Sequence, residues 1–405
     1  MNIPHDKFCI LPWVSLETTP LGTLRPCCLA EKEIVDNDGN KFDLNTANFL
    51  DVQNSDYMKN LRQQFLDEKQ PRTCTKCWKE EASGRTSKRM HTLDRLKHVV
   101  DDTEWTADAK TLMFLDLKLG NICNLKCRIC GSWSSSQFAV EELNYMGKED
   151  GEKKDSPHYK MLKAGAWPKE NPTFWNEIDQ CLDQIRYIEF TGGEPFMIQE
   201  HFDMLQGIID RGIARQVEIH YNTNGTHFPE FAENIWSQFK LVEIAISIDD
   251  VGERFEYQRT NAVWSEVEAN ILKFKELAKR IPFLKLQFCS TVNVFNVAYL
   301  ETLANYLDQH NFKFIYWNMM HDAYYFSIST LPDSAKQIIK QRLENAVVSD
   351  KNRKEFDLII DFMMRGVSLD GNILRMKVKD LDWKRGQNLC DHHPELAAAI
   401  GYAGP

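Results

Sequence analysis

The sequence has no uninterrupted apolar run that approaches the roughly 18 residues needed to cross a bilayer. Its opening residues, MNIPHDKFCILPW, also lack the basic segment and the apolar segment that make up an export signal. Internal repeats and low-complexity tracts are missing as well. These absences argue against a membrane-spanning or repeat protein. They predict a globular protein with a cytoplasmic location and no membrane association.

An excess of positive charge is also missing. The 405 residues include 49 Lys and Arg against 59 Asp and Glu, so the formal net charge is −10. A surface built mainly to neutralise nucleic-acid phosphates would need the opposite balance, so nucleic acid is not the expected partner, although a local basic groove stays open. The hydrophobic content of 43% provides enough apolar material for one large domain and a small one.

Cysteine, by contrast, is plentiful, with eleven residues. In a reducing compartment so many cysteines indicate metal ligands or reactive groups rather than disulfides. Cys181, Cys289 and Cys390 are scattered, and we expect them to be small buried apolar residues. The other eight form two groups along the sequence, the first with Cys9, Cys27, Cys28, Cys74 and Cys77 and the second with Cys123, Cys127 and Cys130.

From about residue 111 the sequence alternates between strand-like and helix-like segments. Crossovers of this length imply parallel strands in βαβ units, and hence an α/β sheet or a complete or partial barrel. The charged segment 147–170 has no clean period and is interpreted as a solvated insertion. Strands are predicted at 112–118, 186–190, 217–222, 242–248, 284–290 and 313–318, and helices at 200–211, 262–280, 298–310, 334–347 and 354–365.

Polar residues alternate with apolar ones along these strands. If the apolar set faces the helices, the polar set points into the barrel, which would then suit a polar cofactor. The alternative is that some of these residues are paired charges in the core. The inward set is predicted to include Asp116, Lys118, Glu189, Thr191, Glu218, His220, Glu243, Ser247, Lys285, Gln287 and Cys289.

The second cysteine group stands in NICNLKCRIC, directly after the first predicted strand. Three thiolates on one short loop suit an iron-sulfur cluster, whereas a structural zinc site usually takes four protein ligands. This C-x3-C-x2-C spacing resembles the motif of the radical S-adenosylmethionine (SAM) superfamily. The resemblance implies that Cys123, Cys127 and Cys130 hold a [4Fe-4S] cluster whose open iron is chelated by SAM.

The second predicted strand runs into TGGEP, residues 191–195, which resembles the GGE motif of the same superfamily. Two glycines allow the backbone to approach a ligand closely. The resemblance implies that Gly192 and Gly193 flank the methionyl part of SAM and that Glu194 binds its amino group.

Two further strand ends are similar to the pattern of this superfamily, NTNG after the third strand and SIDD after the fourth. The resemblance makes Asn222, Ser247 and Arg259 candidate SAM contacts. Ser247 could equally be an ordinary strand serine, and Arg259 could be a surface ion-pair residue. Ile129 departs from the family pattern, which often has an aromatic residue before the third cysteine.

The first cysteine group resembles the twitch module, a short relative of the SPASM domain that holds an auxiliary cluster. FCILPW and PCC precede CTKCW, and Gly22 lies shortly before Cys27. The resemblance implies a second [4Fe-4S] cluster on Cys9, Cys27, Cys74 and Cys77, with Cys28 as a spare or a substitute. Such a module normally follows the barrel, but here it precedes it. A structural zinc site on the same four cysteines is the alternative.

The combined prediction is a partial (β/α)6 barrel of the TIM type with an N-terminal auxiliary module and C-terminal helices. The module is expected at 1–92, a linker at 93–110, the radical SAM barrel at 111–325 and a helical extension at 326–405. A loop on the surface is expected around the string Cys390, Asp391, His392 and His393, before the helix-like segment PELAAAI.

The family implies cleavage of SAM to a 5′-deoxyadenosyl radical that abstracts hydrogen from a substrate C–H bond. It also implies a flavodoxin or ferredoxin-type electron donor. A peptide or protein is the favoured substrate, and a carbohydrate, nucleoside or nucleic-acid base is the alternative. A hypothesis of another class is a non-catalytic metal-binding interaction protein. The sequence identifies no general base.

Overall fold

The computed structural model describes residues 3–82, 86–100, 104–109, 111–147, 150–312, 315–321 and 323–405. Eight strands form a sheet with the order β2-β1-β3-β4-β5-β6-β7-β8. Parallel pairing joins β1 to β3, β3 to β4, β4 to β5 and β7 to β8, while β1 and β2 are antiparallel. The predicted α/β class with parallel strands of a partial TIM-like barrel is therefore confirmed.

The six predicted strands are present with ends shifted by at most two residues. Residues 313 and 314 of the last prediction lie outside the described residues. The observed strands are β3 (Phe114–Lys118), β4 (Tyr187–Thr191), β5 (Glu218–Thr223), β6 (Leu241–Ser247), β7 (Leu284–Val292) and β8 (Ile315–Met319).

Two strands were not predicted, β1 (Ser15–Thr18) and β2 (Leu24–Arg25). All four residues of β1 are buried, although its sequence, SLET, is mostly polar. The strand is short and buried on both faces, so it shows none of the alternation that marks a half-exposed strand. β1 pairs in register with β3, from Ser15 opposite Phe114 to Thr18 opposite Leu117.

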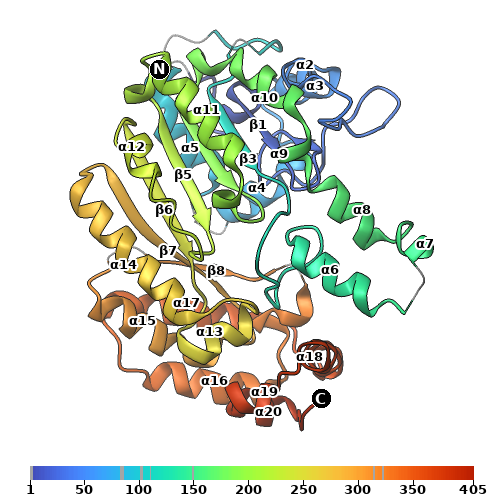
Figure 1. Cartoon of the computed structure of the whole chain (residues 1–405), viewed down its shortest axis with the longest axis vertical. Coiled ribbons are helices and arrows are strands. Elements are labelled where there is room, and N and C mark those ends of the chain that lie inside the picture. The colour runs from blue at the N-terminus through green and yellow to red at the C-terminus, as the bar shows by residue number, and fades with distance from the viewer. Residues whose placement is uncertain are drawn as a thin grey trace. The chain divides into compact units, whose positions relative to one another are not determined.

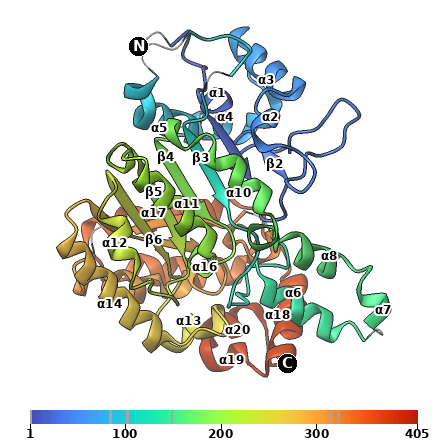
Figure 2. The ribbon, with the colours of Figure 1, turned by 45° about the horizontal axis from the view of Figure 1, so that its top comes forward.

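The chain divides into two compact units. Unit 1 comprises Met1–Cys123, Asp150–Tyr221 and Pro229–Val242. In Figure 2 its strands β3, β4 and β5 lie side by side. Its helices are α1 (Leu11–Val14), α2 (Phe49–Val52), α3 (Asp56–Leu66), α4 (Thr75–Ala82), α5 (Lys88–Leu96), α7 (Asp150–Lys153), α8 (Pro157–Ala164), α9 (Trp167–Glu170), α10 (Pro172–Asp179), α11 (Gln199–Asp210) and α12 (Ala232–Trp236).

The described part of the segment 147–170, residues 147 and 150–170, is not a wholly solvated insertion. It contains α7, α8 and α9, and its end is not solvated, because Trp167 and Pro168 are buried. The Trp167 ring packs edge-on against Phe174 of α10, with 4.9 Å between ring centroids. The buried Trp167 side chain therefore fixes the end of this segment, although the charged residues of the segment show no helical period in the sequence.

Unit 2 comprises Asn124–Glu149, Asn222–Phe228 and Glu243–Pro405. Helices α16, α17, α19 and α20 pack together in the orange and red part of the ribbon (Figure 1). Its helices are α6 (Ser136–Tyr145), α13 (Gly252–Gln258), α14 (Trp264–Arg280), α15 (Leu300–Gln309), α16 (Asp333–Asn345), α17 (Asp350–Arg365), α18 (Asn372–Arg385), α19 (Leu389–His392) and α20 (Pro394–Ile400).

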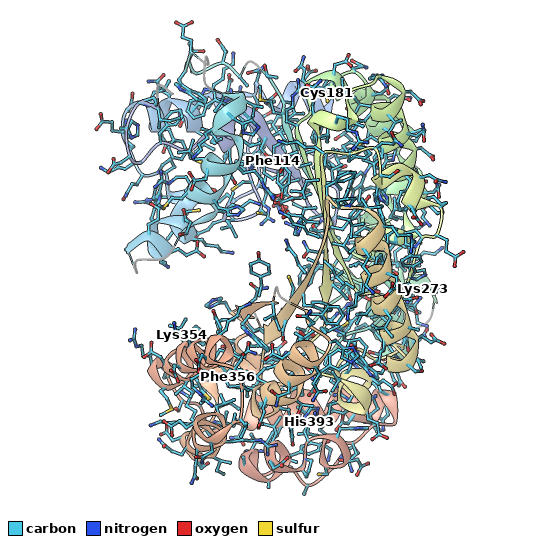
Figure 3. The ribbon with its side chains drawn as sticks, turned by 90° about the vertical axis from the view of Figure 1, so that its left-hand side faces the viewer. Phe114, Cys181, Lys273, Lys354, Phe356 and His393 are labelled. Carbon is cyan, nitrogen blue, oxygen red and sulfur yellow. The ribbon has the colours of Figure 1, made fainter. Side chains whose placement is uncertain are left out.

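The surface loop expected around Cys390 is wrong, because Cys390, Asp391 and His392 belong to helix α19. His393 is fully buried among these helices (Figure 3), and its ring lies 5.2 Å from that of Tyr257. Burial holds the pKa of His393 well below its usual value, so the ring is neutral.

Among the described residues, no helix has both the length and the apolar character of a membrane span.

Candidate functional site

Four of the N-terminal cysteines lie in one pocket of unit 1. Cys9 precedes α1, Cys27 follows β2, Cys74 ends a short 3-10 helix and Cys77 lies in α4. All four line a pocket whose other walls are largely apolar and include Leu11, Leu29, Ala30, Phe65 and Trp78. The fold thus brings together residues that are up to 68 positions apart in the sequence, from Cys9 to Cys77.

The electrostatics of this pocket suit a positively charged occupant. Burial, and then the charge of Cys9, raise the pKa of the Cys27 thiol to about 12. Burial and the neighbouring cysteines likewise raise the pKa of Cys9 and of Cys74. Four thiolates in an apolar pocket are therefore unfavourable by themselves, and iron ions would offset their repulsion. The four residues fit an iron-sulfur cluster.

Arg89 of α5 forms the polar side of the same pocket. Its guanidinium pairs with Glu81 at 2.6 Å and donates to the backbone oxygens of Asp6 and Phe8 at 2.6 and 2.8 Å. Because Phe8 directly precedes Cys9, these bonds fix the first cysteine against α5. Sequence patterns gave no signal for this contact.

The fifth N-terminal cysteine, Cys28, faces a different group of residues. It lies with Asp116 of β3 and Glu189 of β4, and their three possible ligand atoms are within 4.8 Å of one another. The pocket that Cys27 lines does not include Cys28 among its lining residues. Cys27 and Cys28 are therefore adjacent in the sequence but lie in two different environments.

The loop after β4 lies against the start of the three-cysteine loop in unit 1. Gly193 N donates to Gly120 O at 2.9 Å, and Glu194 N donates to Ile122 O at 2.8 Å, one residue before Cys123. A Cβ on Gly193 would overlap Ile122 O. The glycine is required because no side chain fits between the two loops.

The preceding glycine is constrained as well. Gly192 has φ of +113°, and a Cβ there would lie 2.6 Å from Leu119 N. Glu194 is fully buried, and its carboxylate accepts from Phe196 N at 3.2 Å. The TGGEP segment is thus a tight turn that is half-buried at its two glycines and buried at Glu194, and its backbone lies against the cysteine loop.

The other two cysteines of the loop, Cys127 and Cys130, lie in unit 2 beside a buried cation. Their interaction with each other and then burial raise the pKa of Cys127, while the charge of Arg259 lowers it. Arg259 is 8% exposed and pairs with Asp249 at 2.7 Å. The alternative that Arg259 is a surface ion-pair residue is therefore wrong, because its partner and its surroundings are buried.

The last two predicted contacts lie at strand ends. Asn222 is near the carboxyl end of β5, and Ser247 is the last residue of β6. Both are half-buried. Their positions agree with the rule that ligands of parallel α/β folds bind at the carboxyl ends of strands, and their contact with SAM stays a prediction.

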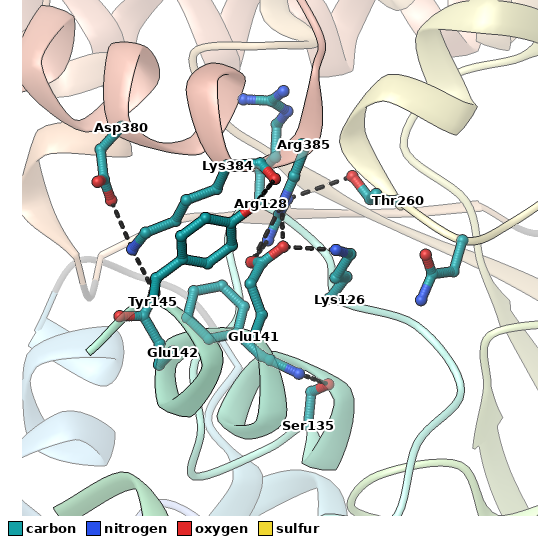
Figure 4. Close-up of polar contacts among 12 residues, drawn as sticks. Lys126, Arg128, Ser135, Glu141, Glu142, Tyr145, Thr260, Asp380, Lys384 and Arg385 are labelled. Atoms are coloured by element: carbon teal, nitrogen blue, oxygen red, sulfur yellow. Dashed lines mark hydrogen bonds and ion pairs between the residues drawn. The ribbon is translucent and has the colours of Figure 1, made fainter. Parts of the chain in front are cut away.

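Two basic residues of the cysteine loop are connected to the C-terminal helix α18 within unit 2. Arg128 pairs with it directly, and Lys126 is connected through Glu141 of α6, which Figure 4 shows between Lys126 and Arg385. Arg128 pairs with Asp382 at 2.6 Å, and both side chains are fully buried. Glu141 of α6 bridges the loop and the helix, because it pairs with Lys126 at 2.5 Å and with Arg385 at 2.9 Å.

The backbone of the same loop is fixed as well. Lys126 N donates to Thr260 O at 3.1 Å, and Arg128 N donates to Gln258 O at 2.8 Å. The Arg128 guanidinium also stacks over the Tyr257 ring at 3.6 Å. The residues on either side of Cys127 are therefore held by their backbones and by both basic side chains.

Residues 117–305 match the family model of the radical SAM superfamily. The chain carries a radical SAM domain. Residues 9–78 match the SPASM iron-sulfur cluster-binding domain, which here precedes the radical SAM domain. The matches assign a [4Fe-4S] cluster and SAM to the first domain and an auxiliary iron-sulfur cluster to the second. A radical SAM domain is an enzyme domain, so the non-catalytic alternative is set aside.

Among solved structures, the radical SAM chain is similar to native anSMEcpe with bound AdoMet and Cp18Cys peptide. The identity is 18% over 58% of this chain and 59% of that chain, with a TM-score of 0.38. It is also similar to TYW1 with a lysine-pyruvate adduct bound, at 12% identity over 58% of this chain and 72% of that chain, with a TM-score of 0.30. The chain thus spans about three fifths of the anSMEcpe chain. No curated protein matches it.

Proposed function

We propose that this protein uses a reduced [4Fe-4S] cluster on Cys123, Cys127 and Cys130 to cleave SAM, and that the radical formed abstracts hydrogen from a substrate C–H bond. The observation that supports this most directly is the bond from Glu194 N to Ile122 O, which joins the TGGEP turn to the residue before Cys123. The turn that carries the buried Glu194 is thereby joined to the residue before the first proposed cluster ligand.

The residues around the cysteines have separate tasks in this proposal. Gly192 and Gly193 let the turn pack closely against the cysteine loop, where they would flank the methionyl part of SAM, and Glu194 accepts hydrogen bonds from its ammonium. Arg259 is the buried cation beside Cys127 and Cys130, where it can balance thiolate charge or bind a carboxylate. Asn222 and Ser247 offer polar groups at the carboxyl ends of two strands.

The auxiliary cluster is assigned to Cys9, Cys27, Cys74 and Cys77. Four protein ligands leave no iron open to SAM, so this cluster would transfer an electron or shape the substrate site. With this assignment, residues 1–92 form the auxiliary module, 93–110 the linker, 111–325 the radical SAM barrel and 326–405 the helical extension. A flavodoxin or ferredoxin-type protein of the cytoplasm would supply the electron.

The substrate proposed is a peptide or protein, because the auxiliary module resembles those of enzymes that modify ribosomally made peptides. Modification of a carbohydrate, nucleoside or nucleic-acid base is the second candidate. It is favoured by the polar residues Asp116, Glu189 and Glu243 on the strands, since such side chains can bind hydroxyl and amino groups.

Anaerobic incubation with SAM and dithionite tests the proposed function, with 5′-deoxyadenosine measured by mass spectrometry. The reconstituted wild type should form it, and replacement of Cys123, Cys127 and Cys130 by Ala should abolish it. Replacement of Cys74 and Cys77 by Ala should leave some 5′-deoxyadenosine. Equal formation by the wild type and the triple variant would refute the proposal.

A further inference from the structure

A row of ionisable side chains crosses four neighbouring strands of unit 1 at one level. The parallel registers pair Glu17 of β1 with Asp116 of β3, Asp116 with Glu189 of β4, and Glu189 with His220 of β5. Paired residues of neighbouring strands point to the same face of a sheet, so three carboxyl groups lie next to one another. Because like charges at adjacent positions repel, each carboxylate needs a compensating partner.

The two outer carboxylates of the row have such partners. Glu17 pairs with Arg25 at 2.6 Å and also with Lys118. Lys88 Nζ lies 2.6 and 2.8 Å from the two carboxylate oxygens of Glu189. The outer positions are therefore neutralised by the chain itself.

The central carboxylate has no ion pair of its own in the described part of the chain, although the charges of Lys88 and Arg25 act on it. Asp116 is 2% exposed, forms no ion pair with a described residue, and its Oδ2 atom accepts no hydrogen bond from the described part of the chain. The Cys28 thiol hydrogen-bonds to the carboxylate but brings no charge. A buried acceptor without a donor destabilises the fold, and it does so more strongly when it is ionised. Asp116 is therefore an acceptor prepared for a donor from outside the described chain.

Geometry identifies the kind of donor. One oxygen of Asp116, one oxygen of Glu189 and the Sγ atom of Cys28 lie within 4.8 Å of one another. A tetrahedral ammonium whose nitrogen is about 2.9 Å from three acceptors holds those acceptors about 4.7 Å apart. The side chains of Glu189 and Lys88 are 14% and 17% exposed, so the row is open to solvent on one side.

Other ligand classes fit less well. A divalent metal would draw its ligands to about 2.0–2.3 Å and would bring two positive charges beside the Lys88 ammonium, where a substrate ammonium brings one. A phosphate or carboxylate would meet a row of carboxyl groups. A hydroxyl offers one donor to three acceptors.

We propose that Asp116, together with Glu189 and Cys28, binds a primary ammonium group of the substrate. This inference rests on the proposed function and specifies it, because the substrate peptide would present a lysine side chain or a free amino terminus. Cys28 directly follows Cys27, so the ammonium binds next to the auxiliary cysteine pocket. The row of carboxyl groups therefore selects substrates that carry a positive charge, and it holds that charge close to the auxiliary cluster.

Binding of small probes to the reconstituted protein tests this site by isothermal titration calorimetry. The probes are Nα-acetyl-lysine amide, its trimethyl-lysine analogue, Nα-acetyl-norleucine amide and norleucine amide with a free α-amine. The trimethyl analogue keeps the charge but has no N–H donor, and the acetylated norleucine probe has no cation. The variant Asp116→Asn removes the charged acceptor, and Asp94→Asn is the control because its side chain is 78% exposed.

We expect one of the two primary amines to bind at least tenfold more tightly than the trimethyl and acetylated norleucine probes, and the amine that binds shows which source the site takes. Asp116→Asn should abolish this preference, whereas Asp94→Asn should keep it. Equal binding of all probes by the wild type, no binding of either amine, or one zinc per chain that is lost in Asp116→Asn would overturn the inference. The comparison within the wild type needs no variant, and 5′-deoxyadenosine formed without any probe tests the proposed function separately.

Discussion

Replacing Asp382 by Asn should destabilise unit 2 strongly, because it breaks a fully buried ion pair and leaves Arg128 without a counter-charge. The Asp382 carboxylate lies 2.6 Å from Arg128 and accepts from the hydroxyls of Tyr257 and Tyr402 at 2.9 and 2.8 Å and from Leu389 N at 2.8 Å. Removal of one partner of a buried pair typically costs about 3–5 kcal/mol.

The control is Asp380→Asn on the same helix. Asp380 pairs with Lys384 at 2.9 Å, but its side chain is 49% exposed, so the loss should stay within about 1 kcal/mol. Urea unfolding followed by circular dichroism gives both free energies. Arg128→Met should also destabilise, and the double variant should lose less than the sum of the single variants, because the two groups form one pair.

Equal losses of unfolding free energy in Asp382→Asn and Asp380→Asn would show that the buried pair contributes no more than the exposed one. Additive losses in the Arg128 and Asp382 variants would show that the two groups do not act as a pair. A positioning role for the pair has a spectroscopic sign as well. Because Arg128 lies between Cys127 and Cys130, Asp382→Asn should alter the electron paramagnetic resonance spectrum of the reduced SAM-binding cluster, whereas Asp380→Asn should not.

Three further outcomes follow from the structure. Gly193→Ala should weaken SAM binding at least tenfold in equilibrium dialysis, because its Cβ would overlap Ile122 O; unchanged affinity in a folded protein would contradict the tight turn. Burial, and then the charge of Glu189, raise the pKa of Asp116 to about 7, so its ionised form opposes folding increasingly as the pH rises from about 4 to 7. Asp116→Asn should therefore gain roughly 2 kcal/mol more unfolding free energy at pH 8 than at pH 5, and no such difference would show that the carboxylate is compensated. Cys27→Ala should lower the iron content of reconstituted protein from about eight to about four per chain, whereas Cys28→Ala should keep about eight; the reverse result would exchange their roles.

Local patterns predicted those parts of the fold that depend on neighbouring residues. The segment 242–248 alternates large apolar residues with Glu243, Ala245 and Ser247, and the ends of β6 agree with this prediction within one residue. The glycines of TGGEP were expected to approach a ligand, and the structure shows that they lie close to the backbone of the cysteine loop; their contact with SAM stays a prediction. The four residues of β1 escaped prediction because a short strand buried on both faces carries no period.

Contacts between distant residues could not be predicted in the same way. Arg128 and Asp382 are 254 positions apart, and neither stands in a pattern that refers to the other. Helix α18 was not predicted, since its many charges and its exposed Trp383 blur the apolar face. Asp116 and Glu189 were expected to point inward, but the registers of β3 and β4 were needed to show that they are neighbours.

The two proposed clusters differ in the number of their cysteine ligands. The cluster that binds SAM has three, and the cluster that does not bind SAM has four. Electron paramagnetic resonance of dithionite-reduced protein, with and without SAM, measures this difference directly. The Cys74→Ala/Cys77→Ala variant should keep a [4Fe-4S] signal whose g values shift when SAM is added. The variant with Ala at 123, 127 and 130 should give a [4Fe-4S] signal that SAM leaves unchanged. A SAM-dependent shift in the second variant, or none in the first, would contradict the assignment of the two clusters.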